Sequence, residues 1–183
     1  MEESNWVHLK SESGTSIGRF DTRHDSLRNP RNNKEIKVTI IEGRDAVNVV
    51  AITENKEVLL VRQLRFGTSE MSLELPGGLM NEGEDQLDGI KRELQEETGF
   101  TGSSWRYLTT IASNPVFMNN YVHTWVATNV QWTNQLNLDE EEDIEIIKVS
   151  IPKLKELLIQ GVFTHPHAIS AITTFLLKSN MLR

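Results

Sequence analysis

Carboxylates are concentrated in one short segment, Gly77 to Phe100, which reads GGLMNEGEDQLDGIKRELQEETGF. It holds seven acidic side chains and only two basic ones, although like charges one helical turn apart destabilise a helix. Glu93, Glu96 and Glu97 follow the spacing i, i+3, i+4, which places their carboxylates on one face of a helix. Oxygen ligands at this density suit Mg²⁺ or Mn²⁺, so one interpretation is a metal site. The other is a solvated acidic helix face.

The residues around these glutamates predict a helix over 86–97. Its apolar positions recur at i, i+3 and i+7 and form one stripe: Leu87, Ile90 and Leu94. Asn81 or Asp85 is a candidate N-cap, and Gly99 is a candidate for the residue that ends the helix. The helix is therefore expected to pack through its apolar stripe and to present the carboxylates on an adjacent face.

A second acidic cluster, LDEEEDIE, covers 138–145 and contains six acidic side chains and no basic one. The two acidic clusters together carry a formal charge of −11, whereas the whole chain carries −7. The acidity is therefore local, and the rest of the chain is net positive. Two internal acidic clusters in one folded domain suggest a shared cation site. The alternative is a charged surface loop.

The rest of the sequence predicts alternating strands and helices. Strands are expected at 6–11, 17–22, 36–42, 105–112, 121–129 and 144–150, with a hairpin over 46–65 and a short strand before Pro76. A turn-rich connector covers 28–35. One further helix is expected to open at Pro152 and stop at Gly161, and a last helix to cover about 168–179.

The spacing of the first cluster matches the Nudix box at every specified position. The matching residues are Gly78, then after five residues Glu84, after seven more Arg92-Glu93-Leu94, and then Glu96-Glu97 and Gly99-Phe100, each pair after one residue. The chain therefore resembles the Nudix hydrolases, which use Mg²⁺ to split pyrophosphate links in nucleoside diphosphates joined to another group. The resemblance implies an α/β fold, with a mixed β-sheet sandwiched between helices.

The resemblance also implies roles for individual residues. The implied metal ligands, for Mg²⁺ or Mn²⁺, are Glu93, Glu96, Glu97 and the carbonyl of Gly77. Glu96 and Glu97 are expected to be catalytic as well, because the metal that they hold offsets substrate charge and lowers the pKa of water. Glu84 and Arg92 are expected to form an ion pair that braces the loop and the helix.

Other segments resemble the ADP-ribose pyrophosphatase branch of this family. VRQLR (61–65) resembles its RQYR element, with Leu64 in place of tyrosine. LELPGG (73–78) resembles its LELPAG element, with Gly77 in place of alanine. Pro115 stands 16 residues after Gly99, where the branch carries a proline, but SNPVFMNN departs from the Ser-Pro-Gly often found there. The resemblance covers 45–183, and residues 1–44 are expected to form extra strands that mediate dimerisation.

The branch resemblance extends to the substrate and to the general base. Arg44, Arg65 and Pro115 are expected to bind the substrate, although an arginine at a strand end is commonly part of a surface ion pair. In the branch a loop glutamate before Asp-Ile serves as base or extra metal ligand, which corresponds to Glu142 here, with Glu140 and Glu141 as alternatives. His165 and His167 are interpreted as structural.

Composition narrows the class of protein. The chain contains no cysteine, which excludes disulfides, zinc–thiolate sites and cysteine nucleophiles. The sequence contains no run of about 18 apolar residues, so no membrane-spanning helix is predicted. The acidic start MEESNWVHLK is unlike a secretory signal, so a cytoplasmic protein is expected. An acidic chain without basic tracks also disfavours nucleic acid as a partner.

The sequence thus predicts a homodimeric enzyme that uses Mg²⁺ to hydrolyse the pyrophosphate bond of nucleoside diphosphate sugars. ADP-ribose is the leading substrate and GDP-mannose the next, and the products are a nucleoside monophosphate and a sugar phosphate. The alternatives are a Nudix hydrolase of nucleoside triphosphates or capped RNA, and a ligand-sensing Nudix domain without turnover.

Overall fold

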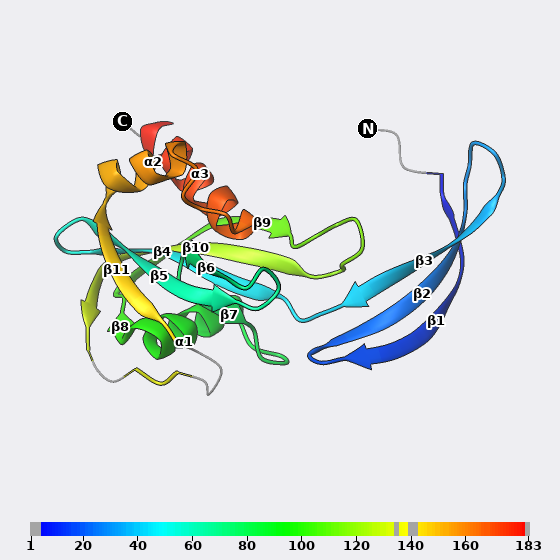
Figure 1. Ribbon diagram of the computed structural model, residues 1–183, viewed down its shortest axis with the longest axis horizontal. Helices are drawn as coiled ribbons and strands as arrows, with labels where there is room; N and C mark the ends of the chain where they lie inside the picture. Colours follow the sequence, from blue (N-terminus) through cyan, green and yellow to red (C-terminus); the bar gives the residue numbers. More distant parts are fainter. Residues whose placement is uncertain (1–4, 134–135, 139–142, 182–183) are drawn as a thin grey trace. The chain divides into compact units, whose positions relative to one another are not determined.

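The computed structural model describes residues 5–133, 136–138 and 143–181, and the chain divides into two compact units. The first unit comprises Met1–Arg44 and Ala112–Tyr121. The second comprises Asp45–Ile111 and Val122–Arg183 and contains all three helices (Figure 1). No helix in the described ranges is long and apolar enough to cross a membrane.

The first unit is a three-stranded antiparallel sheet in the order β1 (Val7–Ile17), β2 (Phe20–Arg28), β3 (Glu35–Glu42). Its first hairpin corrects the predicted strand at 17–22, because Ile17 pairs with Phe20 across a two-residue turn. Gly18 adopts a φ of 60° in this turn, a conformation that glycine takes without steric cost. The connector predicted at 28–35 lies between β2 and β3, as expected.

The segment Ala112–Tyr121 joins the first unit through β3. The N–H of Ile41 donates to the carbonyl of Phe117 at 2.7 Å, and Ile41 also forms a bridge with Met118. The side chain of Asn120 donates to the carbonyl of Arg44 at 2.9 Å. This segment, which includes Pro115, is therefore folded with the N-terminal strands although it lies about 70 residues later in the sequence.

The second unit is built on an eight-stranded mixed sheet with the central order β11-β5-β4-β10-β8. The strands are β4 (Ala46–Thr53), β5 (Glu57–Arg65), β6 (Glu70–Glu74), β7 (Gly77–Leu79), β8 (Phe100–Thr101), β9 (Ser104–Ala112), β10 (Tyr121–Trp132) and β11 (Glu145–Ser150). Strands β4 and β10 are parallel, while β6 pairs with β5 and β7 pairs with β4 in antiparallel fashion. The predicted hairpin at 46–65 is confirmed; β7 and β8 were not predicted.

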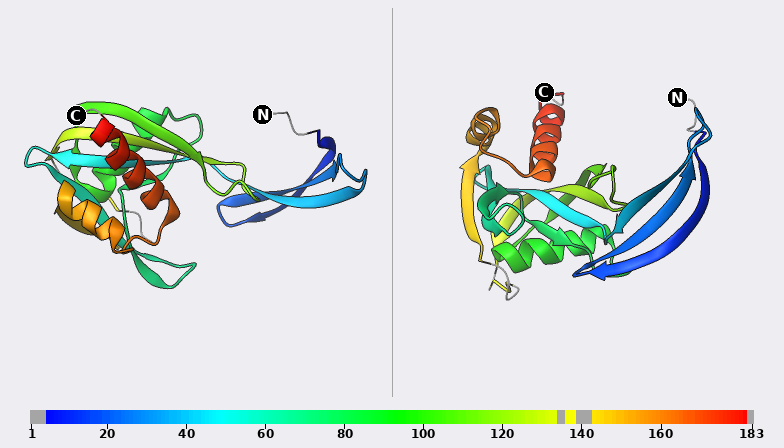
Figure 2. Two further views of the ribbon diagram at one scale, coloured as in Figure 1. Left: turned by 90° about the horizontal axis from the view of Figure 1, so that it is seen from above. Right: turned by 45° about the vertical axis from the view of Figure 1, so that its right-hand side comes forward.

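Helices cover both faces of this sheet, which confirms the predicted α/β sandwich. Helix α1 (Gln86–Thr98) lies on one face, and α2 (Ile151–Ile159) and α3 (Pro166–Met181) lie on the other (Figure 2). The alternation of side chains along β4 produces the two cores: Val49 packs in the cluster with α1, while Val50 packs in the cluster with α2 and α3.

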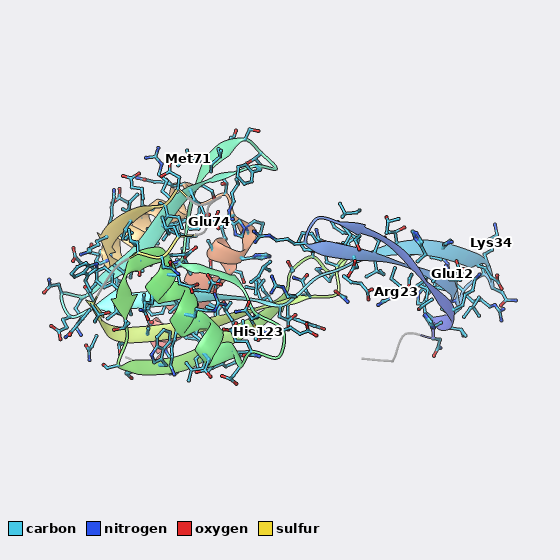
Figure 3. All side chains as sticks on the ribbon, turned by 90° about the horizontal axis from the view of Figure 1, so that it is seen from below. Glu12, Arg23, Lys34, Met71, Glu74 and His123 are labelled. Atoms are coloured by element: carbon cyan, nitrogen blue, oxygen red, sulfur yellow. The ribbon has the colours of Figure 1, made fainter. Side chains whose placement is uncertain are left out.

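A hydrogen-bonded network around the buried His123 holds the start of the parallel strand pair. His123 on β10 lies between Asp45 and Thr110, with its Nε2 3.0 Å from Asp45 Oδ2 and its Nδ1 2.7 Å from Thr110 Oγ1. The hydroxyl of Tyr107 donates to the same threonine oxygen at 2.8 Å. His123 is buried within the second unit (Figure 3). The network therefore fixes β9 and β10 to the residue that precedes β4.

Candidate active site

Helix α1 begins and ends at capped residues that the sequence predicts. Asp85 is the N-cap, and its side chain accepts a hydrogen bond from the N–H of Leu87 at 2.8 Å. Gly99 ends the helix with a φ of 70°, and its N–H donates to the carbonyl of Gln95. Ile90 and Leu94 are fully buried, so the apolar stripe fixes the rotation of the helix on the sheet.

The glutamates of α1 are held against β7. Glu93 is 8% exposed and Glu97 is 2% exposed, while Glu96 is partly exposed. The N–H of Gly77 donates to Glu97 Oε2 at 2.8 Å. Gly78 lies so close to Glu93 that a Cβ at this position would be 2.6 Å from Glu93 Oε2. The absence of a side chain at position 78 therefore lets the backbone approach Glu93, and a Cβ there would displace this carboxylate.

Gly77 also meets a requirement of the sheet. It has a φ of +152° and pairs with Asn48 of β4. A Cβ at position 77 would lie 2.1 Å from the carbonyl oxygen of Val47, which is closer than nonbonded atoms can approach. The difference from the LELPAG element, which has alanine here, thus has a physical reason in this chain.

Arg92 connects most of the carboxylates of the box. Its Nε donates to Glu84 Oε1 and its Nη2 to Glu84 Oε2, both at 2.9 Å. Its Nη1 donates to Glu93 Oε1 at 2.8 Å and to Glu96 Oε2 at 2.9 Å. Hydrogen bonds from Arg92 lower the pKa of Glu84 to about 2, and the reciprocal contact with Glu84 raises the pKa of Arg92. The positive charge of Arg92 thus offsets three neighbouring carboxylates.

Removal of the Glu84 charge is expected to destabilise the protein. A pKa lowered from 4.5 to about 2 stabilises the folded state above about pH 4.5, and this contribution is lost as the pH falls toward 2. Glu84→Gln is therefore expected to lower the free energy of unfolding at pH 7 by about 2 kcal/mol. Denaturant titrations should show the difference from wild type shrinking below pH 4.5. If wild type and Glu84→Gln differed equally in free energy of unfolding at pH 7 and at pH 2.5, the ion pair of Glu84 would not be the cause. Glu82→Gln, at an exposed position, is the control.

The donor set fits a divalent cation in its chemistry. Glu93, Glu96 and Glu97 supply hard oxygen atoms from one helix, of the kind that Mg²⁺ and Mn²⁺ prefer, and two of the three are buried. Across the described ranges, no three acidic or histidine side chains converge closely enough to hold a metal ion. Arg92 instead contacts Glu93 and Glu96. These residues would hold a cation only after their contacts with Arg92 and Gly77 adjust.

The predicted substrate-binding residues are divided between the two units. Arg65 lies at the end of β5 in the second unit, where it forms an ion pair with Glu74. Arg44 and Pro115 are exposed residues of the first unit. Glu142, the predicted base, and its alternatives Glu140 and Glu141 lie outside the described residues.

Sequence reasoning missed the importance of Glu74. It is a buried carboxylate in an otherwise apolar stretch, and both of its oxygens accept hydrogen bonds from Arg65. A charged residue between Leu73 and Leu75 could have signalled a buried ion pair, because acidic residues are almost never fully buried without a partner.

Comparison with known proteins agrees with this geometry. The family described as NUDIX domain matches residues 43–171. A methanol dehydrogenase activator from Bacillus methanolicus is 31% identical over 66% of this chain and 65% of its own length. An ADP-ribose pyrophosphatase from Bacillus subtilis (strain 168) is 30% identical over 69% of each chain. The matched region thus spans about two thirds of each relative.

A solved structure extends the comparison to nearly the whole chain. The crystal structure of an ADP compounds hydrolase has a TM-score of 0.85 and covers 98% of both chains at 22% identity, which establishes a shared fold. The family match and the pyrophosphatase relative confirm the resemblance drawn from the Nudix box and from the elements around it. The chain therefore belongs to the Nudix hydrolase family, in which it resembles the ADP-ribose pyrophosphatases.

Proposed function

We propose that this protein hydrolyses the pyrophosphate bond of nucleoside diphosphate sugars, with ADP-ribose as the preferred substrate and GDP-mannose as a second. The products are a nucleoside monophosphate and a sugar phosphate. The observation that carries this proposal is the packing of Glu93 and Glu97 against Gly77 and Gly78, in a chain whose relatives include an ADP-ribose pyrophosphatase. A cytoplasmic location remains a prediction from the sequence.

Nudix hydrolases generally use divalent metal ions, and we propose Mg²⁺, with Mn²⁺ as the substitute. Glu93, Glu96, Glu97 and the carbonyl of Gly77 would hold it. A bound divalent cation supplies charge compensation for the phosphates and lowers the pKa of an attacking water. The packing of α1 on the sheet through Ile90 and Leu94 holds the backbone of these residues in place, so cation binding requires only that the side-chain contacts with Arg92 and Gly77 adjust. Glu84 and Arg92 support this helix from the preceding loop.

The remaining chemistry is assigned to residues that meet the substrate and the water. Glu142 is proposed as the general base that takes a proton from the attacking water. Arg65 is proposed to bind a phosphate group, because a guanidinium presents a planar set of donors that matches phosphate oxygens. Arg44 and Pro115 are proposed to contact the nucleotide or the sugar.

A panel of substrates tests the proposed function. Values of kcat/KM should be measured with Mg²⁺ for ADP-ribose, GDP-mannose, ADP-glucose, ATP and GTP. ADP-ribose is expected to be cleaved most efficiently, since a triphosphate brings more negative charge to an acidic site and meets greater repulsion. If ATP or GTP is cleaved faster than both ADP-ribose and GDP-mannose, the substrate class is wrong even though the reaction type stands.

The methanol dehydrogenase activator from Bacillus methanolicus suggests a second candidate function. Its name describes an activator of another enzyme, which is a role beyond turnover of a small substrate alone. The two candidates are separated by assaying the purified protein by itself. Hydrolysis of ADP-ribose by the protein alone supports the hydrolase function. Hydrolysis that appears only when a partner enzyme is added supports the activator function.

We also propose that the protein is a homodimer formed through its N-terminal strands. Among the described residues, every buried hydrophobic side chain belongs to the second unit, whereas the buried residues of the first unit are the polar Thr22, Asp25 and Asn120. Apolar side chains of β1 and β3 are exposed, including Ile17 at 60% and Ile36 at 40%. A sheet without a hydrophobic core of its own gains stability when a second copy covers these side chains.

Light scattering tests the dimer. The wild-type protein is expected to have twice the mass of one chain, and Ile17→Lys combined with Ile36→Lys is expected to shift it toward the monomer. Phe66→Ser, which changes an exposed aromatic residue of the second unit, serves as the control and should leave the mass unchanged. A wild-type monomer at assay concentration would contradict the proposal.

A further inference from the structure

Arg65 is held by a carboxylate that is almost completely buried. Its Nε donates to Glu74 Oε1 and its Nη2 donates to Glu74 Oε2, both at 2.7 Å. The side chain of Glu74 is 4% exposed, whereas that of Arg65 is 41% exposed. Figure 3 shows Glu74 on β6, in the body of the second unit. One side of the guanidinium is thus fixed by the protein interior while much of the side chain faces solvent.

This ion pair differs from an ordinary surface pair on the same strand. Arg62, also on β5, makes one hydrogen bond of 3.2 Å to Glu145, and both side chains are about half exposed. A buried carboxylate is costly to desolvate, and an apolar residue of similar volume often stabilises a fold as well. Stability alone therefore explains poorly why β6 carries a carboxylate at position 74.

A role in orienting the guanidinium of Arg65 explains the buried carboxylate at position 74 better. A guanidinium is planar and carries five N–H donors in a fixed arrangement, so fixing two of them sets the direction of the whole group. Fixing it in advance reduces the conformational entropy that is lost when an anion binds. The Glu74 carboxylate is suited to this task because it is charged. Burial raises its pKa, but the hydrogen bond and the charge of Arg65 outweigh burial, and the net shift is downward.

His165 contributes a third member to this cluster without competing for the carboxylate. Its Nδ1 lies 3.6 Å from Glu74 Oε2, beyond a normal hydrogen bond, just before α3. Burial lowers the pKa of His165, and the neighbouring His167 and Arg65 lower it further against the opposing effect of Glu74. The lowered pKa favours the neutral imidazole, and the two contacts of 2.7 Å make Arg65 the cation that pairs with Glu74.

The same short segment links Arg65 to the glutamates of α1. Two residues after Glu74 comes Pro76, whose carbonyl accepts from the N–H of Val49 at 3.0 Å, and next comes Gly77, whose N–H donates to Glu97. The residues 74–77 thus contact Arg65 at one end and a proposed metal ligand at the other. A displacement of this segment would move both groups together.

We infer that Glu74 is a positioning residue, which orients the guanidinium of Arg65 toward a phosphate group of the substrate and sets its place relative to the α1 glutamates. The inference rests on the proposed function, in which Arg65 binds a phosphate. Glu74 does not contact the substrate and acts through Arg65.

The effect is expected in substrate binding more than in turnover. Glu74→Gln keeps the size of the side chain but replaces one acceptor oxygen by a donor, so the two-point contact with Arg65 is lost. KM for ADP-ribose is expected to rise by about 10-fold, while kcat changes by less than about 3-fold. Glu145→Gln removes the partner of Arg62 and serves as the matched control, with both constants expected within about 2-fold of wild type.

A double-mutant cycle separates positioning from a structural role. If Glu74 acts through Arg65, Glu74→Gln should raise KM in the wild-type background but have no further effect in Arg65→Ala, which lacks the guanidinium and its charge. An equal effect in both backgrounds, or an unchanged KM in a folded Glu74→Gln protein, would overturn the inference. If Glu74→Gln does not fold, Glu74→Asp keeps the charge with a shorter reach and is expected to give an intermediate KM; an unchanged KM in that variant would equally overturn the inference.

Failure of the proposed function gives a different result. In that case the wild-type protein hydrolyses no nucleoside diphosphate sugar, and the affinity for inorganic pyrophosphate with Mg²⁺ is measured by calorimetry in its place. Weaker binding by Glu74→Gln than by wild type and Glu145→Gln supports the positioning role by itself. Equal affinity in all three proteins would exclude it.

Discussion

Glu97→Gln is expected to lower kcat for ADP-ribose by about 10²-fold or more, equivalent to about 3 kcal/mol of transition-state stabilisation. Glu97 is 2% exposed and receives the N–H of Gly77, and glutamine can still accept that hydrogen bond through its amide oxygen. The substitution therefore removes the negative charge that would hold a metal while preserving the local packing. The measurement is steady-state turnover at saturating Mg²⁺, together with the melting temperature.

Asp88→Asn is the matched control for this experiment. Asp88 is an exposed acid on the same helix, paired loosely with Lys91 at 3.7 Å. Its loss should leave kcat within about 2-fold of wild type. Near-normal turnover in Glu97→Gln would mean that the carboxylate face of α1 is only a charged surface.

The second large effect is expected at the proposed general base. Glu142→Gln should lower kcat by about 10²-fold or more, because general-base catalysis contributes on the order of 10² to 10⁴ in rate. The melting temperature should stay unchanged, since the substitution alters proton transfer and keeps the shape of the side chain. The pH profile of kcat should lose its acidic limb in this variant.

The neighbouring acids distinguish the alternatives within this cluster. Glu140→Gln and Glu141→Gln are expected to retain normal turnover. Full activity in Glu142→Gln with a large loss in one of the other two would reassign the base. Full activity in all three would leave the cluster as a charged surface loop.

Local patterns made helix α1 predictable. The apolar stripe of Ile90 and Leu94, the cap at Asp85 and the terminal Gly99 are all encoded within one short stretch, so periodicity and capping chemistry define the element. The box spacing identified the carboxylates in the same way. The mixed sheet between helices was implied by the resemblance to the Nudix hydrolases, and the number and order of the β-rich runs were compatible with it.

Features that depend on contacts distant in sequence could not be predicted. Strand β7 has only three residues and forms because Gly77 pairs with Asn48 of β4, a contact that no local pattern reveals. The two-residue strand β8 is equally invisible to periodicity. The second contact of Arg92, with Glu93 and Glu96, also requires a particular rotamer of a long side chain. The pairing of Arg65 with Glu74 is hidden as well, because the register of β5 and β6 sets Arg65 opposite Glu70 and Glu74 opposite Val61.

The close approach at Gly77 has a consequence for protein engineering. Replacing each residue by the one most frequent among relatives is a common route to greater stability. At position 77 the element of the branch favours alanine, but its methyl carbon would lie 2.1 Å from the carbonyl oxygen of Val47 in this chain. We therefore expect Gly77→Ala to destabilise this protein. A consensus design of this protein should exempt Gly77, because Val47 and Asn48 of β4 lie too close to it for a side chain.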